Sequence, residues 1–454
     1  MSSLEDLAAE LRTGSRGAID LILDAIARYE ETEDRLNAYR SWAGHRAVVQ
    51  AKAVDELLRA GVDLGPLMGI PVSVKDLYGV PSLPVYAGTD TAFPEEWQEA
   101  GPVVTRLLSQ VAIVTGKSHT VEFAFGGLGT NPHCGTPLNP WSSPDAPRVP
   151  GGSSSGAGVS LAQGSALAAL GTDTAGSVRI PASFTGQTAL KVTHGRWSQE
   201  GIVPLSPSFD TPGILARSIA DLTFLFTAID GGDRISKQDI GGLRLGVVEN
   251  VVWDDVDPVV AANTEAAFAA LERAGAKVSR VYLRHADDVL DIFRRGGLAA
   301  PELRAFLDGN FPDRIARLDP AVMARVVAAD DVTASEYLQR RAAFERYGRL
   351  AQEVFARVDL LVTPTIATSA PLLADLEDPD AYRTANMLAL RNTAIVNLLG
   401  WCATTLPTGL DGNGIPTGLQ IIAPPHHEER LLAAALGIEA VLGAGPDLLG
   451  PPPL

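Results

Sequence analysis

The chain has 454 residues, 46% of them hydrophobic, which is enough for a large buried core. Its formal net charge of −17 argues against nucleic acid and anionic membrane surfaces as partners, because both require clustered Lys and Arg. The only two cysteines, Cys134 and Cys402, are too few to indicate a disulfide framework and are typical of free thiols in a cytoplasmic protein.

Residues 3–60 are predicted to be helical. The run "GAIDLILDAIARYEETEDRL" places Ile19, Ile22, Ile26 and Tyr29 at helical spacing. The N-terminus lacks a basic region followed by an apolar run, and no uncharged apolar stretch of about 18 residues occurs. We therefore expect residues 1–60 to form N-terminal helices packed on the core, with no signal peptide and no membrane span.

The pattern changes to alternating strands and helices from about residue 66. Short β-branched runs recur in "GIPVSVKDLYGV", "VAIVTGK", "LRLGVVEN", "AKVSRVYL", "DLLVTPT" and "GLQIIAPP", and helical segments separate several of them. This alternation predicts an α/β fold. Residues 285–355 instead show mostly helical periodicity, and we interpret them as a helical excursion from the sheet.

The stretch 151–183, "GGSSSGAGVSLAQGSALAALGTDTAGSVRIPAS", is unusually rich in glycine and serine. A flexible linker is disfavoured, because the apolar part of this stretch must be buried. A phosphate loop is weakly supported, because Val111 stands where the pattern ending in Gly116-Lys117-Ser118 requires its first glycine. Close backbone packing and a serine nucleophile remain, and the two are compatible.

A serine nucleophile needs a base to accept its proton. The run "TAGSVR" around Ser177 does not match the G-x-S-x-G elbow of α/β-hydrolases, so a Ser-His-Asp site is not indicated locally, although a histidine distant in sequence remains an alternative. Lys75, which ends the hydrophobic run "GIPVSVK", is a second candidate base, because burial lowers the pKa of a lysine. The alternative is a lysine at a strand end that reaches water.

Taken together, these residues resemble the amidase signature family of serine hydrolases. The resemblance is strong over residues 60–230 and looser over 355–443. It implies one large α/β domain at residues 61–450, with a mixed central β-sheet flanked by helices on both faces. The motifs that carry it are "PLMGIPVSVKD", "GKSHTVEFAFG", "TNPHCGTPLNP", "PGGSSSG" and "LGTDTAGSVRIPASFTG".

The resemblance implies a Ser–cis-Ser–Lys triad. Ser177 would be the nucleophile, Ser153 the bridging serine twenty-four residues earlier, and Lys75 the terminal base. The Gly152–Ser153 peptide bond would be cis. No metal or organic cofactor is implied, and no H-E-x-x-H or C-x-x-C pattern occurs.

The loop before Ser177 is implied to stabilise an oxyanion. Backbone N–H groups of Thr174, Ala175, Gly176 and Ser177 would point at the tetrahedral intermediate. Many family members have glycine where this chain has Ala175. Ser154 would support the relay or cap the following helix.

Two further residues, Asp173 and Arg179, are expected to hold the oxyanion loop in place. Direct contact with substrate and an ordinary structural ion pair are alternatives for them. A second departure from the family pattern, Val192 where proline is common, does not touch the triad.

The expected reaction is hydrolysis of a small aryl or aliphatic carboxylic amide to an acid plus ammonia or an amine, through a seryl acyl-enzyme. Phe123, Phe125 and the 285–355 segment would line an apolar acyl pocket, unless the two aromatics belong to the core.

Other assignments stay open. One is the A-type glutaminase subunit of a tRNA-dependent amidotransferase, which would need a partner chain. Another is an allophanate- or carbamate-type hydrolase, and a non-catalytic binding module is a third. A homodimer is compatible with the sequence, and the expected ligand is a small-molecule amide.

Overall fold

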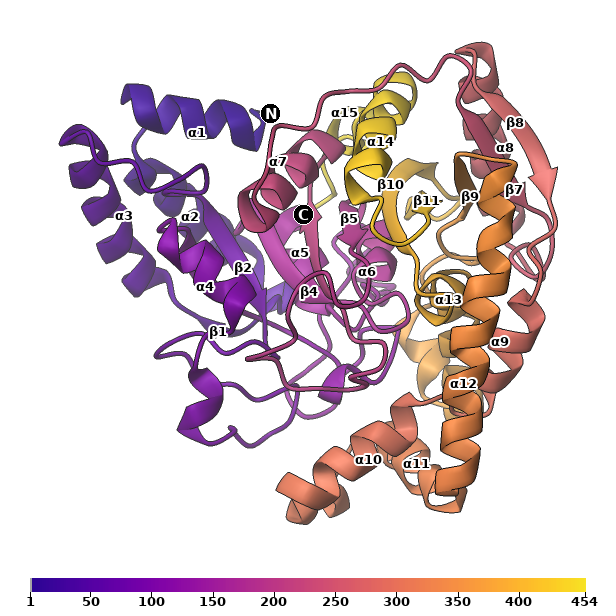
Figure 1. The fold of residues 1–454 in the computed structure, drawn as a ribbon. Helices are drawn as coiled ribbons and strands as arrows, with labels where there is room; N and C mark the ends of the chain where they lie inside the picture. Colours follow the sequence, from indigo (N-terminus) through magenta and orange to yellow (C-terminus); the bar gives the residue numbers. More distant parts are fainter. Residues whose placement is uncertain (1) are drawn as a thin grey trace.

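The structure is a computed structural model that describes residues 2–454, and within them eleven strands form one continuous sheet with helices on both faces (Figure 1). The strands are β1 (Tyr39–Trp42), β2 (Pro71–Lys75), β3 (Ile113–Ser118), β4 (Ala168–Thr172), β5 (Thr188–Lys191), β6 (Pro212–Ala216), β7 (Arg244–Val248), β8 (Lys277–Val281), β9 (Leu360–Pro364), β10 (Cys402–Leu410) and β11 (Pro416–Ala423). Their spatial order is β1-β3-β2-β4-β6-β5-β10-β11-β9-β7-β8.

The sheet is mixed. β2 runs parallel to β3 and β4, and β7 runs parallel to β8 and β9, whereas the other neighbouring strands are antiparallel. The predicted α/β fold, with a mixed central sheet between layers of helices, is therefore confirmed.

Helices cover the sheet on each side. On one face lie α5, α6 and α13; on the other lie α7, α8 and α14, with α1 and α4 packed against α7. The bounds are α1 (Leu4–Thr13), α2 (Ala18–Leu36), α3 (Gly44–Arg59), α4 (Pro102–Ser109), α5 (Ser155–Gln163), α6 (Arg179–Thr185), α7 (Ile219–Asp230), α8 (Pro258–Arg273), α9 (Ala286–Arg294), α10 (Ala299–Asn310), α11 (Pro320–Ala328), α12 (Ala334–Ala351), α13 (Pro379–Leu398), α14 (Glu428–Leu442) and α15 (Gly445–Leu449).

The six β-branched runs named from the sequence all contain strands, namely β2, β3, β7, β8, β9 and β11. The expectation that residues 3–60 are entirely helical is wrong at β1, which pairs antiparallel with β3 at the edge of the sheet. Tyr39 and Trp42 of β1 pack with Tyr29 of α2 in an aromatic cluster, whose ring centroids are 4.0–5.8 Å apart. This packing favours an extended segment where helical periodicity alone does not.

The segment 285–355 contains α9, α10, α11 and α12, and α10 and α11 lie together beside one end of α12 (Figure 1). Leu303 and Leu307 of α10 pack in one apolar cluster with Phe123. The helical excursion therefore covers the chain segment that precedes the Gly/Ser stretch.

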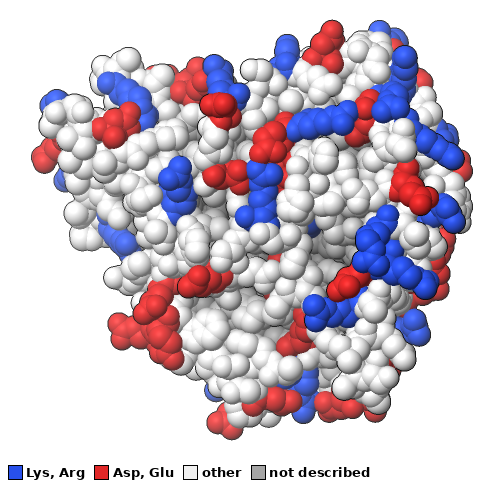
Figure 2. All heavy atoms as spheres, viewed as in Figure 1, with Lys and Arg blue, Asp and Glu red and all other residues white. Residues whose placement is uncertain are grey.

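Both cysteines are free thiols, and Cys402 is buried. One segment, Glu428–Leu449, is long and apolar enough to cross a membrane, but it lies against the sheet, as core helices of soluble proteins do. On the face shown in Figure 2, acidic and basic side chains are interspersed, with basic side chains gathered towards the side of the molecule where α12 lies.

Candidate active site

Lys75 is the last residue of β2, near the middle of one half of the sheet, between β3 and β4. Its side chain is fully buried. The Lys75 Nζ donates hydrogen bonds to Ser153 Oγ at 2.7 Å and to Thr172 Oγ1 at 2.7 Å. The lysine therefore does not reach water from the strand end.

Burial lowers the pKa of Lys75 from its usual 10.5 to about 7. Asp210 and Asp173 act in the opposite direction, but the loss of hydration outweighs them. At neutral pH a large fraction of Lys75 is therefore uncharged and able to accept a proton.

Ser153 is held in a turn that requires glycine. The Gly152–Ser153 peptide bond is cis, and Gly151 has a φ of +80°. A Cβ on Gly152 would lie 2.7 Å from the backbone nitrogen of Gly129, so a larger residue does not fit. The glycines thus let two backbone segments approach closely.

Ser177 follows β4 and precedes α6, and its side chain is buried with 3% exposure. The N–H of Ser154 donates to the carbonyl of Ser177 at 3.1 Å, so the segments that carry the two expected serines run side by side. Among residues 2–454, no hydrogen bond joins the hydroxyls of Ser153 and Ser177. The structure thus brings Lys75 and Ser153 into direct contact and places Ser177 on the adjoining segment.

Ser154 begins α5, but its hydroxyl does not cap that helix. The hydroxyl instead contacts the backbone of Thr172, with its Oγ 3.3 Å from both the carbonyl oxygen and the nitrogen. Ser154 therefore ties the start of α5 to the end of β4 and does not itself face a substrate.

The four N–H groups expected to bind an oxyanion are not equivalent. The N–H of Gly176 donates to Asp173 Oδ1 at 2.7 Å and is therefore occupied. The N–H groups of Thr174, Ala175 and Ser177 have no backbone or side-chain acceptor among the described residues. Gly176 is thus a correction to the expected donor set, because the carboxylate that holds the loop takes its N–H.

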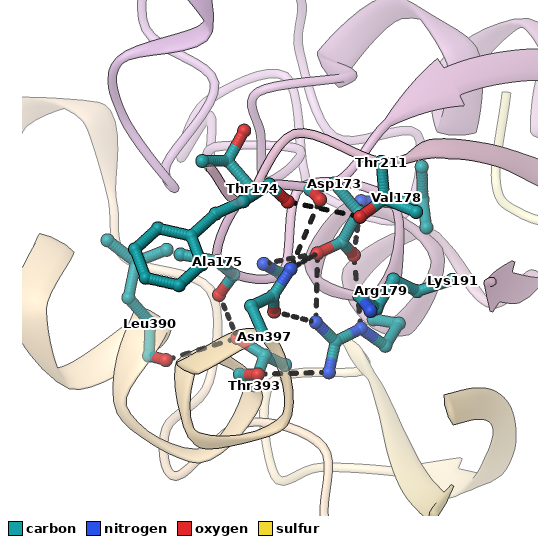
Figure 3. Close-up of polar contacts among 12 residues, drawn as sticks. Asp173, Thr174, Ala175, Val178, Arg179, Lys191, Thr211, Leu390, Thr393 and Asn397 are labelled. Atoms are coloured by element: carbon teal, nitrogen blue, oxygen red, sulfur yellow. Dashed lines mark hydrogen bonds and ion pairs between the residues drawn. The ribbon is translucent and has the colours of Figure 1, made fainter. Parts of the chain in front are cut away.

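Asp173 and Arg179 form a buried ion pair at 2.9 Å, which supports the structural interpretation of these residues (Figure 3). Burial by itself would raise the pKa of Asp173, but the Arg179 charge and several hydrogen bonds hold it at about 2. Asn397 of α13 donates to the same carboxylate at 2.9 Å and accepts from Arg179 Nη2 at 2.6 Å. The loop is therefore fixed to α13 by fully paired charges.

The loop also contacts α13 through Thr393, whose hydroxyl donates to the carbonyl of Ala175 at 2.7 Å (Figure 3). The Cβ of any larger residue at position 176 would lie 2.1 Å from Thr393 Oγ1. Gly176 also has a φ of +133°, which disfavours other residues. Close approach and backbone conformation together require glycine here.

The two aromatics expected to line an acyl pocket differ. Phe123 is fully buried among apolar side chains and belongs to the core. Phe125 is half-buried, and the guanidinium of Arg325 lies 4.5 Å from its ring centroid. Within residues 2–454, no group of three His, Cys, Asp or Glu residues could hold a metal ion.

Comparison with known proteins identifies the family. Residues 20–432 match the Amidase family. The chain belongs to the amidase family. It is 57% identical over 456 residues to the 2-amino-5-chloromuconic acid deaminase of Comamonas testosteroni, with 100% of this chain and 98% of that protein covered. It is 30% identical to the A-type component of the glutamyl-tRNA(Gln) amidotransferase of Thermobifida fusca, over 98% and 97% of the two chains.

Solved amidase structures share the fold. A crystal structure of an amidase, 29% identical, superposes with a TM-score of 0.87 and covers 97% of this chain and 100% of its own. The peptide amidase from Stenotrophomonas maltophilia, 26% identical, gives a TM-score of 0.85 over 99% and 98% of the chains. The predicted family and its reaction class, hydrolysis of C–N bonds, are confirmed.

Several residues around the site of this amidase were not predicted. Thr172 contacts Lys75, and Asp210 accepts a hydrogen bond from Thr174 Oγ1 at 2.5 Å. Asn397 and Thr393 come from α13, more than two hundred residues further along the chain. No local pattern marks these polar residues, because only the folded chain places them beside the loop.

Proposed function

We propose that this amidase cleaves a C–N bond through Ser177, with Ser153 and Lys75 as its proton relay. The observation that carries the proposal is the 2.7 Å contact between Ser153 Oγ and a buried lysine whose pKa is about 7. A general base works best when its pKa lies near the operating pH. A buried Lys–Ser pair next to a second serine has no evident structural purpose.

In the first half-reaction, neutral Lys75 takes the proton of Ser153, and Ser153 takes the proton of Ser177 as Ser177 Oγ adds to the substrate carbon. The N–H groups of Thr174, Ala175 and Ser177 receive the developing negative charge. The relay then returns a proton to the nitrogen, which leaves as ammonia or an amine. Water enters by the same relay and releases the acid from the serine.

For the substrate, the relative that is 57% identical is named for a 2-amino-substituted chloromuconic acid, a six-carbon unsaturated dicarboxylic acid. In its imine tautomer, the carbon that bears nitrogen is an electrophile comparable to an amide carbonyl. Addition of Ser177 Oγ, loss of ammonia and addition of water would yield the 2-oxo acid and restore the serine. A small amino-substituted unsaturated dicarboxylate is therefore the favoured substrate, ahead of a simple aryl or aliphatic amide.

A glutaminase component is the second candidate, because the A-type component of the tRNA-dependent amidotransferase matches over almost the whole chain at 30% identity. The higher identity to the deaminase favours the small dicarboxylate. The two differ in a simple way, since the glutaminase reaction would use glutamine and depend on a partner chain.

The test is ammonia release by the purified chain from 2-aminomuconate, from aryl and aliphatic amides and from glutamine. We expect release from 2-aminomuconate without a partner, and loss of at least about 10³-fold in kcat for Ser177→Ala. Ser183→Ala, which removes a serine hydroxyl from α6, is the matched control and should retain activity. Ammonia release by Ser177→Ala at the wild-type rate would refute the proposal.

A further inference from the structure

We infer that Arg325 is the group that binds the distal carboxylate of a dicarboxylate substrate, an inference that rests on the proposed function. Arg325 lies on α11, within the helical excursion, and its side chain is half-buried. Its Nε donates to the carbonyl of Ala321 at 2.8 Å, and its guanidinium covers the ring of Phe125. Its Nη2 is buried without a hydrogen-bond partner among residues 2–454.

An unpaired Nη2 is unusual for a buried guanidinium, because buried polar groups are normally hydrogen-bonded. The nearby carboxylates are occupied by other groups. Glu122 accepts from the N–H of Asp319 at 2.7 Å and lies 2.9 Å from His133 Nε2. Asp319 caps α11 through the N–H of Ala321. No ion pair involves Arg325 within the described part of the chain.

The ring below Arg325 is held close to the catalytic turn. The N–H of Val121 donates to the carbonyl of Ser153, and the N–H of Gly152 donates to the carbonyl of Gly127. Both ends of the segment 121–127 are therefore fixed to the turn that carries Ser153. Phe125 is two residues from Gly127, so their Cα atoms lie within about 7.6 Å of each other.

No other cation of the site is suited to a carboxylate. Lys75 loses charge near neutral pH and contacts two hydroxyls. Arg179 is paired with Asp173 in the interior. Lys191 donates to two backbone carbonyls. A chain with a net charge of −17 needs a local cation to hold a dianion, and a guanidinium binds a carboxylate through two parallel hydrogen bonds.

The direct test compares binding of trans,trans-muconate and sorbate, two six-carbon dienes that differ by one terminal carboxylate in place of a methyl group. Calorimetry with the full chain should show tighter binding of muconate. Arg325→Met should weaken muconate binding by about 10–100-fold, the effect of one charge-assisted contact, and change sorbate binding by less than about threefold. Arg325→Lys should retain part of the preference.

Arg317→Met is the matched control, because it removes the same charge from an exposed position of the same excursion. It should leave the muconate preference unchanged, and thermal melting of each variant checks folding. Equal binding of the two ligands by the wild type, or an equal loss for both in Arg325→Met, would overturn the inference. Because binding is measured without turnover, an inactive chain that still prefers muconate through Arg325 would refute only the proposed function.

Discussion

At the scale of single residues, Lys75 shows how burial changes chemistry. A lysine at the end of a strand is normally charged and hydrated. Here β3 and β4 enclose it on both sides, and its nitrogen contacts only hydroxyl groups among the hydrogen bonds of the described chain. The cost of removing an ammonium from water lowers its pKa to about 7.

The pH dependence of the reaction follows from this pKa. Because the base must be neutral, kcat/KM should fall about tenfold per pH unit below about pH 7 and level off above it. A steady-state pH profile checks this. A profile that stays flat down to pH 5 would be inconsistent with Lys75 as the base.

Lys75→Met separates catalysis from stability. The folded-state pKa lies below the usual 10.5, so between these values the unfolded chain binds more protons and the contribution of Lys75 to stability rises with pH. Below about pH 7 the fold must bury the charged form, at its greatest cost. Lys75→Met should therefore lose activity yet unfold at pH 6 in no less denaturant than the wild type.

At the scale of elements, the loop between β4 and α6 is held by side chains from three parts of the chain. Asp173 accepts from Arg179, Asn397 and the N–H of Gly176. Arg179 also donates to Gln420 Oε1 of β11 at 2.5 Å. The loop is thereby oriented before any substrate arrives, which is the condition for electrostatic stabilisation of a transition state.

Gly176→Ala tests this arrangement. The new Cβ would clash with Thr393, and its φ would remain in a region that disfavours alanine. We expect a loss of at least about 100-fold in kcat and about 1–3 kcal/mol in unfolding free energy. Gly309→Ala in α10, where nothing lies within 4 Å, is the control and should change stability by no more than about 1 kcal/mol. Normal kcat in Gly176→Ala would argue against a fixed loop.

At the scale of the whole molecule, the helical excursion is connected to the loop by hydrogen bonds. Glu302 of α10 accepts from Ser206 Oγ at 2.7 Å and from Tyr337 of α12 at 2.9 Å. The N–H of Ser206 donates to Asp210, which in turn accepts from Thr174. The excursion thus contributes to the position of the oxyanion loop without touching it.

Glu302→Ala should weaken this connection. We expect kcat/KM to fall by about tenfold, from the loss of hydrogen bonds to a buried charged acceptor, with little change in the melting temperature. Glu345→Ala on α12 removes an exposed carboxylate from the same excursion and should have no effect. Steady-state kinetics of both variants decide the point, and equal values would contradict the connection.

The sequence by itself determined the family, the α/β class and six of the strands, because motif spacing and runs of β-branched residues are local properties. It did not indicate β1 or β4. The latter, with the sequence "AALGT", has low strand propensity and is stabilised by its place between β2 and β6.

Only the tertiary structure decided how the site is completed. Lys75, Ser153 and the loop before Ser177 were evident from their motifs, but Asn397 and Asp210 were not, since neither lies in a recognisable pattern. The occupied N–H of Gly176 also depends on where Asp173 points. Hydrogen bonds between residues far apart in the chain are created by packing, so their partners appear only once the sheet and its helices are assembled.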